Sequence, residues 1–581
     1  MYPFGGVAAY QNRNLWVQAR AHQPRTSHPL FRYPNFRDHL PELHDSGHKE
    51  VIVLDDDDSD EEFVVTASQE PQRRKVVDIN QVQRVARGPL SLLPGRDVEL
   101  RDQSFIRIVE YLPDTEDGEC IRGHRLLYQN HWELLMPERQ HELVQLVKIN
   151  DEMEVEDTTS TVHVSQVVRN CTVIFTNRAY NDLQYEKHVE KYTGDKTDQA
   201  VYFCRYTSAD RNVSTEHGDP KGPPLAGRIE RLWANQTDDG ALATPQGLVE
   251  FRIPDSELRR QWRETERSKS RRYTFGDAFS GAGGTSLGAF QAGLKLKVAV
   301  DFDERAIETY KRNFNLSGTE VLEEDVADFI NRAAISGDRY VVDFLHMSPP
   351  CQPFCGANRN PNLEKNERDM DSFSKVPGLL EVCKPRIVTL EEAKSLTDID
   401  KRGHFRNLIC WFIEKGYSIQ WKAVELSRYG VPQTRNRTII IASGPGERLP
   451  AFVQPTHGTE PGLEPFPSII GAIGAIPPNA RHQDEIPEMR TPRTPYSGEG
   501  LCATIMTSVK GHHFHPYGYR RFSIREYACL QTFPLFFVFS GTIHEMLRQI
   551  GNAVPPQFAE TLFVHLKSAL TAADEAEDRG Q

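Results

Sequence analysis

A cysteine on a stiff loop is the first residue in this sequence whose setting points to chemistry. Cys351 follows Pro349-Pro350 directly, after the apolar run Val341–His346. Such a run predicts a buried strand, and open α/β sheets bind their ligands at the carboxyl ends of strands. Prolines stiffen the backbone and can hold the thiol in place. The pattern favours a nucleophile, although a buried structural cysteine is the commoner fate of a lone thiol.

A glycine-rich turn indicates a second site, for a nucleotide-like cofactor. The short strand beginning at Tyr273 ends in a turn that contains Gly281 and Gly283, and Ser286–Phe290 should open a helix. Glycines let the backbone approach a ligand, and Asp301, after the next strand, is placed to accept hydrogen bonds from ribose hydroxyls. A purely structural turn remains an alternative at this point. The ligand could be a dinucleotide or S-adenosylmethionine.

Six phrases in a fixed order narrow these possibilities. They are Asp277–Gly284, Pro349–Gln352, Leu390–Ala393, Tyr429–Arg437, Arg525–Pro534 and Gln549–Pro556. Together they resemble the cytosine-C5 DNA methyltransferase family, and within it the fungal RID/Masc type. The resemblance implies a Rossmann-like, doubly wound α/β domain over residues 273–570 that uses S-adenosylmethionine. A nicotinamide enzyme would need neither the Pro-Pro-Cys-Gln phrase nor the Gln-x-Arg-x-Arg phrase.

The resemblance implies roles for four catalytic residues. Cys351 would add to C6 of cytosine and so make C5 nucleophilic, while Glu391 would protonate or hydrogen-bond N3. Arg435 and Arg437 would hold the cytosine edge and its neighbouring phosphate. C5 would then take the methyl group, and loss of the C5 proton would release the thiol. The cytosine must be flipped out of the duplex, which costs roughly a few kcal/mol.

The same resemblance implies a set of residues around S-adenosylmethionine. They are Phe279, Gly281 and Gly283 along its methionine and adenine side, Asp301 at the ribose, Asp325 at the adenine amino group, and Asn552 and Val554 closing the pocket.

Two features depart from the family pattern. Glu391-Glu392-Ala393 stands where the family has Glu-Asn-Val, so Glu392 is expected to place a second carboxylate beside the acid and near DNA, and to weaken activity. The segment left for reading bases is only about Asn479 to Gly500, because Ser468–Pro478 reads as framework helix. So short a segment predicts loose sequence specificity, with the target chosen by other domains or partners.

The loop Lys510–Arg521 is basic and aromatic, with three histidines. Lysine, arginine and aromatic side chains suit phosphates and unstacked bases, which favours a loop that faces DNA. A metal site is unsupported because no fourth ligand has matching spacing, and an ordinary surface loop is the remaining alternative. We therefore expect no metal.

The N-terminal part has a different organisation. Residues 1–85 are rich in Pro, His, Arg and Asp and predict a disordered tail. Residues 90–255 contain short β-branched runs separated by turn residues, and weakly resemble a bromo-adjacent-homology (BAH) module; a β-domain with no separate activity is nearly as good an interpretation. Residues 256–272 form a basic linker that could contact phosphates or aid nuclear import, although a solvated helix face is the default reading.

A short apolar segment in the tail suggests a protein partner. Val51-Ile52-Val53-Leu54 precedes an acidic run and resembles a SUMO-interacting motif, in which a peptide adds a strand to the partner's sheet. Ser59, followed by three acidic residues, also resembles an acidophilic kinase site. A solvated tract without a partner is an equal alternative.

Charge and composition limit the class of protein. The formal net charge is −13, which alone argues against a general nucleic-acid-coating protein. Most of it comes from the run Asp55–Glu62 and the acidic tail 571–581, both expected to be flexible, so a basic DNA-facing surface stays possible. The sequence shows no membrane span, no secretory signal and no Cys-x-x-Cys.

The interpretation favoured by the sequence is a nuclear DNA cytosine-C5 methyltransferase acting on double-stranded DNA. Its main rival is a non-catalytic chromatin protein that binds DNA and cofactor with the same fold. An RNA cytosine methyltransferase is the third possibility.

Overall fold

The computed structural model describes the larger part of the chain. The described residues are 76–77, 90–128, 135–156, 158–183, 201–210, 226–244, 247–263, 272–315, 317–350, 371–398, 401–489, 494, 497–507 and 514–579. Cys351, Lys510–His513 and most of the predicted tail, including Val51–Leu54, lie outside these residues. Within the tail, Val76–Val77 form the short strand β1, which pairs parallel with β12 (Ala241–Thr244).

The C-terminal domain is built on a mixed, doubly wound sheet with the strand order β16-β15-β14-β17-β18-β20-β19. The strands are β14 (Thr274–Ala278), β15 (Lys295–Asp301), β16 (Glu320–Glu323), β17 (Phe344–Met347), β18 (Ile387–Ala393), β19 (Ser418–Glu425) and β20 (Asn436–Ser443). The first five are parallel, and β20 runs antiparallel to both of its neighbours. This arrangement confirms the Rossmann-like fold expected from the sequence.

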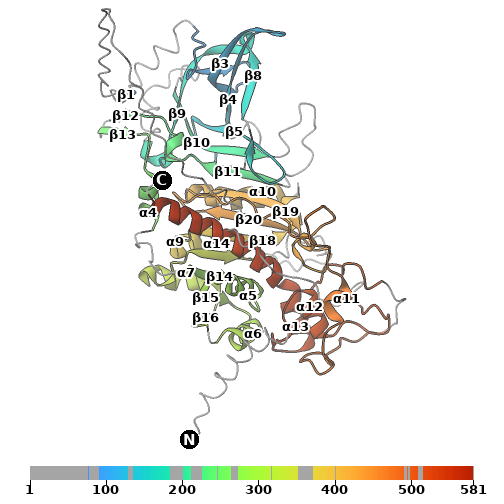
Figure 1. The fold of residues 1–581 in the computed structure, drawn as a ribbon. Helices are drawn as coiled ribbons and strands as arrows, with labels where there is room; N and C mark the ends of the chain where they lie inside the picture. Colours follow the sequence, from blue (N-terminus) through green and yellow to red (C-terminus); the bar gives the residue numbers. More distant parts are fainter. Residues whose placement is uncertain are drawn as a thin grey trace, which may run out of the picture. The chain divides into compact units, whose positions relative to one another are not determined.

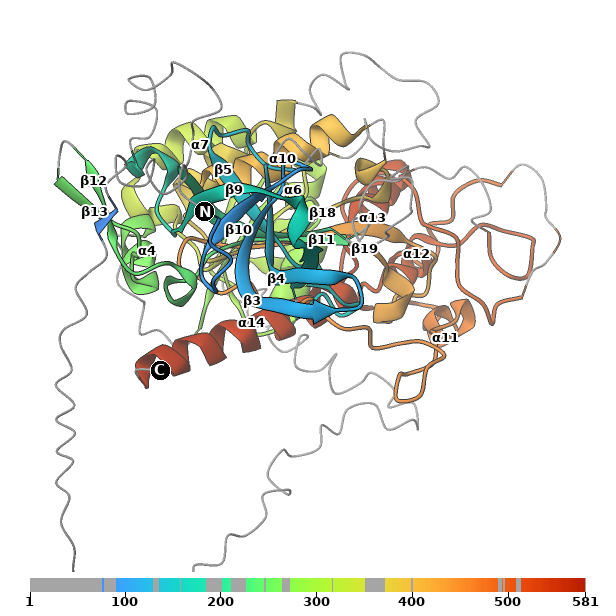
Figure 2. The ribbon, with the colours of Figure 1, turned by 90° about the horizontal axis from the view of Figure 1, so that it is seen from above.

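Helices cover both faces of this sheet. They are α5 (Gly284–Gln291), α6 (Glu304–Phe314), α7 (Val326–Ala334), α9 (Val376–Cys383), α10 (Arg402–Glu414) and α14 (Pro556–Asp578). Apolar side chains of α7, α9 and α10 join the strands in one buried cluster, while Phe563 of α14 packs edge-on against Phe275 and Phe344. Figure 2 shows α14 on one side of the strands and α7 and α10 on the other. The chain order reverses between β14 and β17, and ligands bind at such a switch point.

Residues 97–210 form a closed β-barrel. Its strands are β2 (Asp97–Leu100), β3 (Phe105–Thr115), β4 (Gly118–Tyr128), β5 (Glu142–Leu146), β9 (Val167–Phe175) and β10 (Val201–Asp210). All of them except β2 are labelled in Figure 1. The barrel closes because β9 pairs with both β2 and β10. Its interior is filled by apolar and aromatic side chains such as Phe105, Leu143 and Tyr202, so it is a packed core and not a channel.

A single strand joins the barrel to the catalytic sheet. β11 (Ala226–Arg231) pairs antiparallel with β10 on one side and with β19 on the other. Gly227 lies opposite Trp421 in this ladder, and a Cβ at Gly227 would come within 2.1 Å of the Trp421 ring. The backbones can approach only because residue 227 has no side chain. The two domains therefore share one continuous sheet.

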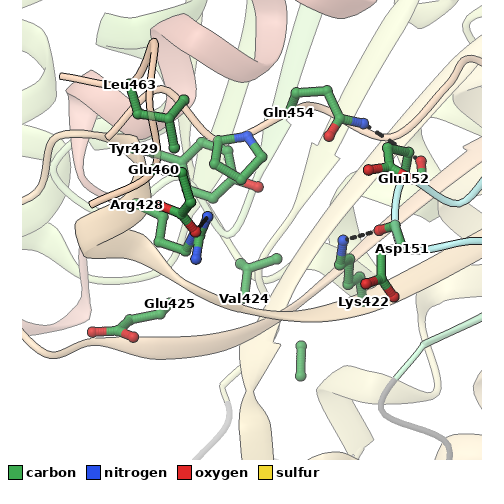
Figure 3. Close-up of a pocket in the computed structure, with 12 residues that line it drawn as sticks. Asp151, Glu152, Lys422, Val424, Glu425, Arg428, Tyr429, Gln454, Glu460 and Leu463 are labelled. Carbon is green, nitrogen blue, oxygen red and sulfur yellow. Dashed lines mark hydrogen bonds and ion pairs between the residues drawn. The ribbon is translucent and has the colours of Figure 1, made fainter. Parts of the chain in front are cut away.

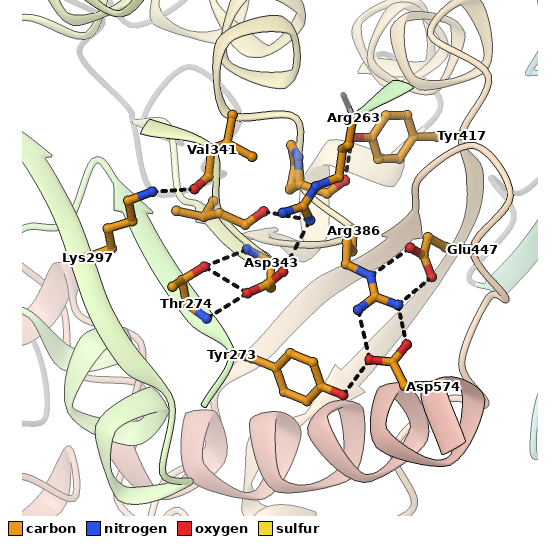
Figure 4. Close-up of polar contacts among 12 residues, drawn as sticks. Arg263, Tyr273, Thr274, Lys297, Val341, Asp343, Arg386, Tyr417, Glu447 and Asp574 are labelled. Atoms are coloured by element: carbon orange, nitrogen blue, oxygen red, sulfur yellow. Dashed lines mark hydrogen bonds and ion pairs between the residues drawn. The ribbon is translucent and has the colours of Figure 1, made fainter. Parts of the chain in front are cut away.

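The acidic C-terminus is not a flexible tail, contrary to the sequence-based expectation. Residues up to Asp578 continue α14, which ends beside α4 (Asp255–Trp262). Asp574 accepts hydrogen bonds from Arg386 at 2.5 and 3.0 Å and from the Tyr273 hydroxyl at 2.8 Å (Figure 4). Arg386 also binds Glu447 at 2.6 and 3.0 Å. Asp574 therefore has a structural role, because it binds the buried Arg386, which lies 188 residues away in the sequence.

The described part of the basic linker is also used within the molecule. Arg259 of α4 forms an ion pair with Glu577 at 2.6 Å, and Arg263 binds Asp343 at 3.2 Å. These two guanidinium groups are committed to protein partners, whereas the Arg260 side chain, paired with Glu257 on its own helix, is 73% exposed. Among the described residues, no helix is long and apolar enough to cross a membrane.

Candidate active site

The glycine-rich turn lies between β14 and α5, at the switch point of the sheet. Gly281 and Gly283 have φ angles of 52° and 90°, and Phe279 has φ of 62°, which is unusual for a residue with a side chain. A Cβ at Gly283 would come within 2.6 Å of Phe314 and 2.9 Å of Tyr310, whereas a Cβ at Gly281 would meet no atom within 4 Å. The turn is therefore packed against α6 on one side and open at Gly281, where a ligand has room.

Asp301 at the end of β15 fixes this turn. One carboxylate oxygen accepts the Gly281 N–H at 2.7 Å and the other accepts the Asp303 N–H at 2.9 Å. Burial raises the pKa of Asp301 to about 6. A carboxylate has about four lone-pair positions, and besides these two N–H groups only the Phe302 backbone adds a donor among the described residues, so one remains for a hydroxyl. The arrangement fits the ribose contact that the sequence predicts for Asp301.

Two further residues near the end of β15 have exposed side chains. Asp325 is exposed at the start of α7, and one of its oxygens accepts the Ala327 N–H at 2.7 Å, which leaves the other for an amino group. Phe302, directly after Asp301, is 57% exposed. The sequence analysis did not single out Phe302, although an aromatic residue directly after the ribose acid is a signal for a stacking surface.

A buried acid, Asp277, lies next to the glycine turn and binds the first turn of α5. Asp277 accepts a hydrogen bond from the Ser286 hydroxyl at 2.5 Å, and the Tyr310 hydroxyl lies 2.8 Å from the same Ser286 oxygen. Burial raises the pKa of Asp277 to about 7. Its second oxygen, Oδ1, has no hydrogen-bond partner among the described atoms. An orphaned buried acceptor beside an open glycine turn fits a cofactor that brings its own donors.

The last of the six sequence phrases, Gln549–Pro556, packs against the same turn. The Val554 carbonyl lies so near Gly284 that a Cβ there would come within 2.4 Å of it. Val554 is 5% exposed, whereas Asn552, the last residue of α13 (Ile543–Asn552), is exposed. The structure thus brings the first and last of the six phrases together. Of Asn552 and Val554, Asn552 is the one with an exposed side chain.

Glu391 lies near the carboxyl end of β18 with two arginines beside it. Arg437 Nε is 2.7 Å and Arg435 Nη2 is 3.6 Å from Glu391 Oε1. Glu391 is 6% exposed. Both arginines come from the antiparallel partner β20 and the residues just before it, where Ala393 pairs with Arg437. The sheet register therefore assembles the predicted acid and both predicted arginines in one place.

The guanidinium group of Arg435 is surrounded by backbone carbonyls of the protein. Its guanidinium group lies 3.2 Å from the Gly551 carbonyl and 3.4 Å from those of Ala553 and Ile505, and it is 2% exposed. These contacts join Glu391 to the last phrase. The role in binding cytosine that the sequence suggests for Arg435 stays a prediction, and a positioning role has the geometric support.

Glu392 is buried, which corrects the expectation that it lies near DNA. It is 0% exposed, and consecutive residues of a strand point to opposite faces of the sheet, so Glu392 points away from the face that Glu391 occupies. Its Oε2 accepts the Ala393 N–H at 3.3 Å. All seven residues of β18 are buried, so this second carboxylate is enclosed by the protein.

The predicted nucleophile itself lies outside the described residues. The structure describes its loop up to Pro350, beginning at Ser348 after β17. The strand end places the start of this loop beside β14 and β18, where Ser348 N–H is 3.4 Å from the Ala278 carbonyl. The described part is consistent with a thiol at the carboxyl edge of the sheet, and the role of Cys351 stays a prediction.

The segment predicted to face DNA presents aromatic side chains. Tyr517 is 66% and Tyr519 78% exposed, while Arg520 pairs with Glu526 at 2.7 Å and Arg521 donates to the Glu488 carbonyl at 3.1 Å. Among the described residues of this segment, the tyrosines are the exposed aromatic groups, and Tyr517 also contacts the His515 ring at 4.4 Å. Within the described ranges, no cluster of three or more His, Cys, Asp or Glu side chains could hold a metal ion.

A separate cavity of about 580 Å³ lies where the barrel meets β19 (Figure 3). Lys422 donates to the Asp151 carbonyl at 2.7 Å, and Arg428 pairs with Glu460 at 2.8 Å. None of the predicted site residues lines it. The Lys422–Asp151 contact joins the two domains at this cavity, whereas Arg428 and Glu460 both belong to the C-terminal domain.

The fold, the glycine turn and its acids define a protein that binds a nucleotide-type cofactor at the switch point of an open α/β sheet. A family model, C-5 cytosine-specific DNA methylase, matches residues 273–471 and 468–568. The chain belongs to this family, and it is an S-adenosylmethionine-dependent DNA cytosine-5-methyltransferase.

Curated relatives agree with the family match. The chain is 30% identical over 319 residues to the type II methyltransferase M.NgoFVII of Neisseria gonorrhoeae, covering 48% of this chain and 82% of that protein. It is 25% identical over 506 residues to DNA (cytosine-5)-methyltransferase 3 of Arabidopsis thaliana, covering 64% of this chain and 35% of that one. Mouse DNA (cytosine-5)-methyltransferase 1 is 27% identical over 293 residues, covering 45% of this chain and 17% of the mouse protein. The plant match covers more of this chain than residues 273–568 contain, so that likeness extends into the N-terminal part.

Proposed function

We propose that this chain methylates C5 of a flipped-out cytosine in double-stranded DNA through a covalent adduct with Cys351. The observation that carries the proposal is the assembly of Glu391, Arg435 and Arg437 at the carboxyl edge of the sheet. The start of the Pro-Pro-Cys loop and the open glycine turn lie at the same edge. An acid, a thiol loop and a cofactor turn are what covalent activation of cytosine needs.

Each residue then has a distinct task. The Cys351 thiolate attacks C6, and Glu391 supplies a hydrogen bond or proton to N3, where negative charge develops. Arg437, 2.7 Å from Glu391 and 14% exposed, orients that carboxyl and can reach the substrate side. Arg435 holds Glu391 and the Gly551–Ala553 carbonyls in register. S-adenosylmethionine supplies an electrophilic methyl group to the activated C5.

The cofactor would be held by residues in and around the glycine turn. Asp301 accepts a ribose hydroxyl with the lone pair not used by the backbone of Gly281, Phe302 and Asp303. Phe302 and Asp325 contact the adenine. Phe279, Gly281 and Gly283 give the methionine part room, and Asn552 and Val554 close the site. Support comes from the open space at Gly281 and the orphaned Asp277 Oδ1.

Transfer of labelled methyl groups to cytosine-containing DNA tests this function. Glu391→Gln should lower the rate by about 10²- to 10⁴-fold, because an acid placed to protonate the transition state contributes that much. Glu425→Gln is the matched control, since Glu425 lies at the end of β19 with its oxygen bound by Ser427. No transfer by the wild-type chain to any cytosine DNA, or transfer to RNA alone, would overturn the proposal.

A second candidate function is a catalytically weak silencing protein that binds DNA and cofactor. The Glu392-Ala393 pair favours it, because a buried carboxylate stands where the family has asparagine. If the Glu392 carboxylate limits activity, the variant Glu392→Asn should transfer methyl groups faster than the wild type. If the wild type is already fully active, the variant should keep the wild-type rate. An inactive wild type whose activity appears in Glu392→Asn would establish the second candidate.

We further infer a nuclear enzyme that acts in fungal repeat silencing or sexual development, and whose DNA target is chosen by other domains or by partner proteins. The short Asn479–Gly500 segment supports loose specificity, and the barrel is proposed as a BAH-like module because the plant relative's likeness extends into this part. Val51–Leu54 is proposed to bind SUMO. Binding of SUMO to the wild-type chain that is lost in Val53→Ala/Leu54→Ala supports that partner, and methylation confined to one short sequence on naked DNA would refute loose specificity.

A further inference from the structure

A buried histidine joins the strand that leads to the Cys351 loop with the strand that carries Glu391. His346 lies on β17 and is 2% exposed. Its Nδ1 is 2.8 Å from Thr389 Oγ1 on β18, and its Nε2 is 2.7 Å from Ser348 Oγ. His346 and Thr389 are direct partners in the β17–β18 register. Both ring nitrogens therefore have a hydrogen-bond partner: one on β18 and one at the start of the loop that follows β17.

The surroundings of His346 suit a fixed connection. Phe563 of α14 packs edge-on against the imidazole at 6.5 Å. Burial lowers the pKa of His346 to about 3, so the ring is neutral under assay conditions. A neutral imidazole has one donor and one acceptor, so one hydroxyl accepts from the ring and the other donates to it. The ring can satisfy both hydroxyls at once without exchanging a proton.

The two hydroxyls stand next to the proposed catalytic residues in the sequence. Ser348 precedes Cys351 by three positions, and Thr389 precedes Glu391 by two. Residues two apart in a strand share a face, so Thr389 and Glu391 lie on the same face of β18. The His346 bridge thus spans from the beginning of the thiol loop to the strand of the acid.

The loop has few other means of attachment at its start. Pro349 and Pro350 have no N–H group to donate. The backbone N–H of Ser348 reaches the Ala278 carbonyl at 3.4 Å, which is long for a hydrogen bond. The Ser348 hydroxyl, at 2.7 Å from His346, is the closer contact of the two. This side-chain contact adds to the backbone pairing of Met347, which holds the end of β17 between β14 and β18.

We propose that His346 is a positioning residue for methyl transfer: it holds Ser348 and Thr389 together and so fixes the Cys351 loop relative to Glu391. The inference rests on the proposed roles of Cys351 and Glu391. His346 itself touches neither cofactor nor cytosine in this account, and its effect reaches the reaction only through the two hydroxyls.

Removing either hydroxyl from the full-length chain tests the proposal. Ser348→Ala and Thr389→Val should each lower kcat and the rate of adduct formation with 5-fluorocytosine DNA about tenfold, with the KM for S-adenosylmethionine unchanged. Because both hydroxyls act through one ring, the double variant should be no slower than the slower single variant. Thr389→Ser keeps the hydroxyl, so its kcat and its rate of adduct formation should equal those of the wild type. Ser443→Ala, which removes a buried hydroxyl at the far end of β20, should have no effect.

Equal rates in wild type and variants, additive losses in the double variant, or a parallel loss of cofactor affinity would overturn the proposal. A second measurement is independent of methylation: the rate at which iodoacetamide alkylates Cys351 without DNA. Ser348→Ala should increase this rate severalfold, because the loop loses its anchor, and an unchanged or lower rate overturns the inference. Absence of an adduct in the wild type would instead count against the proposed function.

Discussion

At the scale of single residues, the cofactor site combines groups that hold the turn with groups left free for a ligand. Asp301 illustrates this, because it accepts backbone N–H groups of three residues and still has one lone pair for a ribose hydroxyl. Its pKa is raised to about 6 by burial, so the protonated carboxyl predominates below that pH. The protonated form is the poorer acceptor.

The affinity for S-adenosylmethionine should therefore fall as the pH drops through about 6. We expect a dissociation constant about tenfold higher at pH 5 than at pH 7.5, measured by isothermal titration calorimetry on the wild-type chain, since about one carboxyl in ten is then ionised. Asp301→Asn should bind weakly and lose this pH dependence. Asp277, whose pKa is about 7, titrates nearby, so Asp277→Asn is the control that should retain the Asp301 step. A wild-type affinity independent of pH would contradict this role.

Some residue-scale features could be predicted from the sequence and others could not. The glycine turn and Asp301 carry their own spacing signal, and the structure places them together. The burial of Glu392 could not be predicted, because two consecutive charged residues normally indicate an exposed strand face, and only the covering of both faces of β18 reverses this. The contacts of Arg435 with carbonyls at positions 505, 551 and 553 join parts of the chain whose proximity no local pattern reveals.

At the scale of elements, the junction of β11 with β19 is the feature that local sequence patterns could not supply. Alternating strands and helices after Tyr273 predict the doubly wound sheet, because each element has its own periodicity. The pairing of residue 227 with residue 421 is instead set by tertiary packing. Without β11, β19 would be an exposed edge strand, which is an aggregation hazard.

Gly227→Ala should therefore destabilise the whole chain. The added methyl group would collide with the Trp421 ring, so we expect the free energy of unfolding to fall by about 1–3 kcal/mol, measured by denaturant unfolding. Gly403→Ala is the control, because a Cβ there meets no atom within 4 Å and alanine favours helix. Equal stability of the two variants would show that the barrel and the catalytic sheet are not closely joined.

At the scale of the whole molecule, the C-terminal helix ties the catalytic domain to the segment that leads in from the barrel. Asp574 binds Arg386 and Tyr273, and Glu577 binds Arg259 of α4. The run of acidic residues in 571–581 predicts a flexible tail that contributes to the net charge of −13. The spacing of these acids along α14 shows that they are paired structural groups, so net charge says little about the substrate surface.

Asp574→Asn should lower the melting temperature of the full-length chain. It weakens the interaction with the nearly buried Arg386, and leaving such a group poorly paired costs about 1–3 kcal/mol. Glu575→Gln is the matched control on the same helix turn, because its pair with Arg579 is exposed and 4.0 Å long; it should change stability by less than about 0.5 kcal/mol. A melting temperature for Asp574→Asn equal to that of Glu575→Gln would contradict the structural role of the C-terminus.

The central claim is that Cys351 attacks cytosine while Glu391 assists, and covalent trapping tests it most directly. Full-length protein is incubated with S-adenosylmethionine and duplex DNA that carries 5-fluorocytosine, and the adduct is located by peptide mass spectrometry. We predict a stable adduct at Cys351 in the wild type, a much slower one in Glu391→Gln, none in Cys351→Ala, and none with the same sequence as RNA. An adduct at another residue, or none in a wild-type chain that binds both DNA and cofactor, would contradict it.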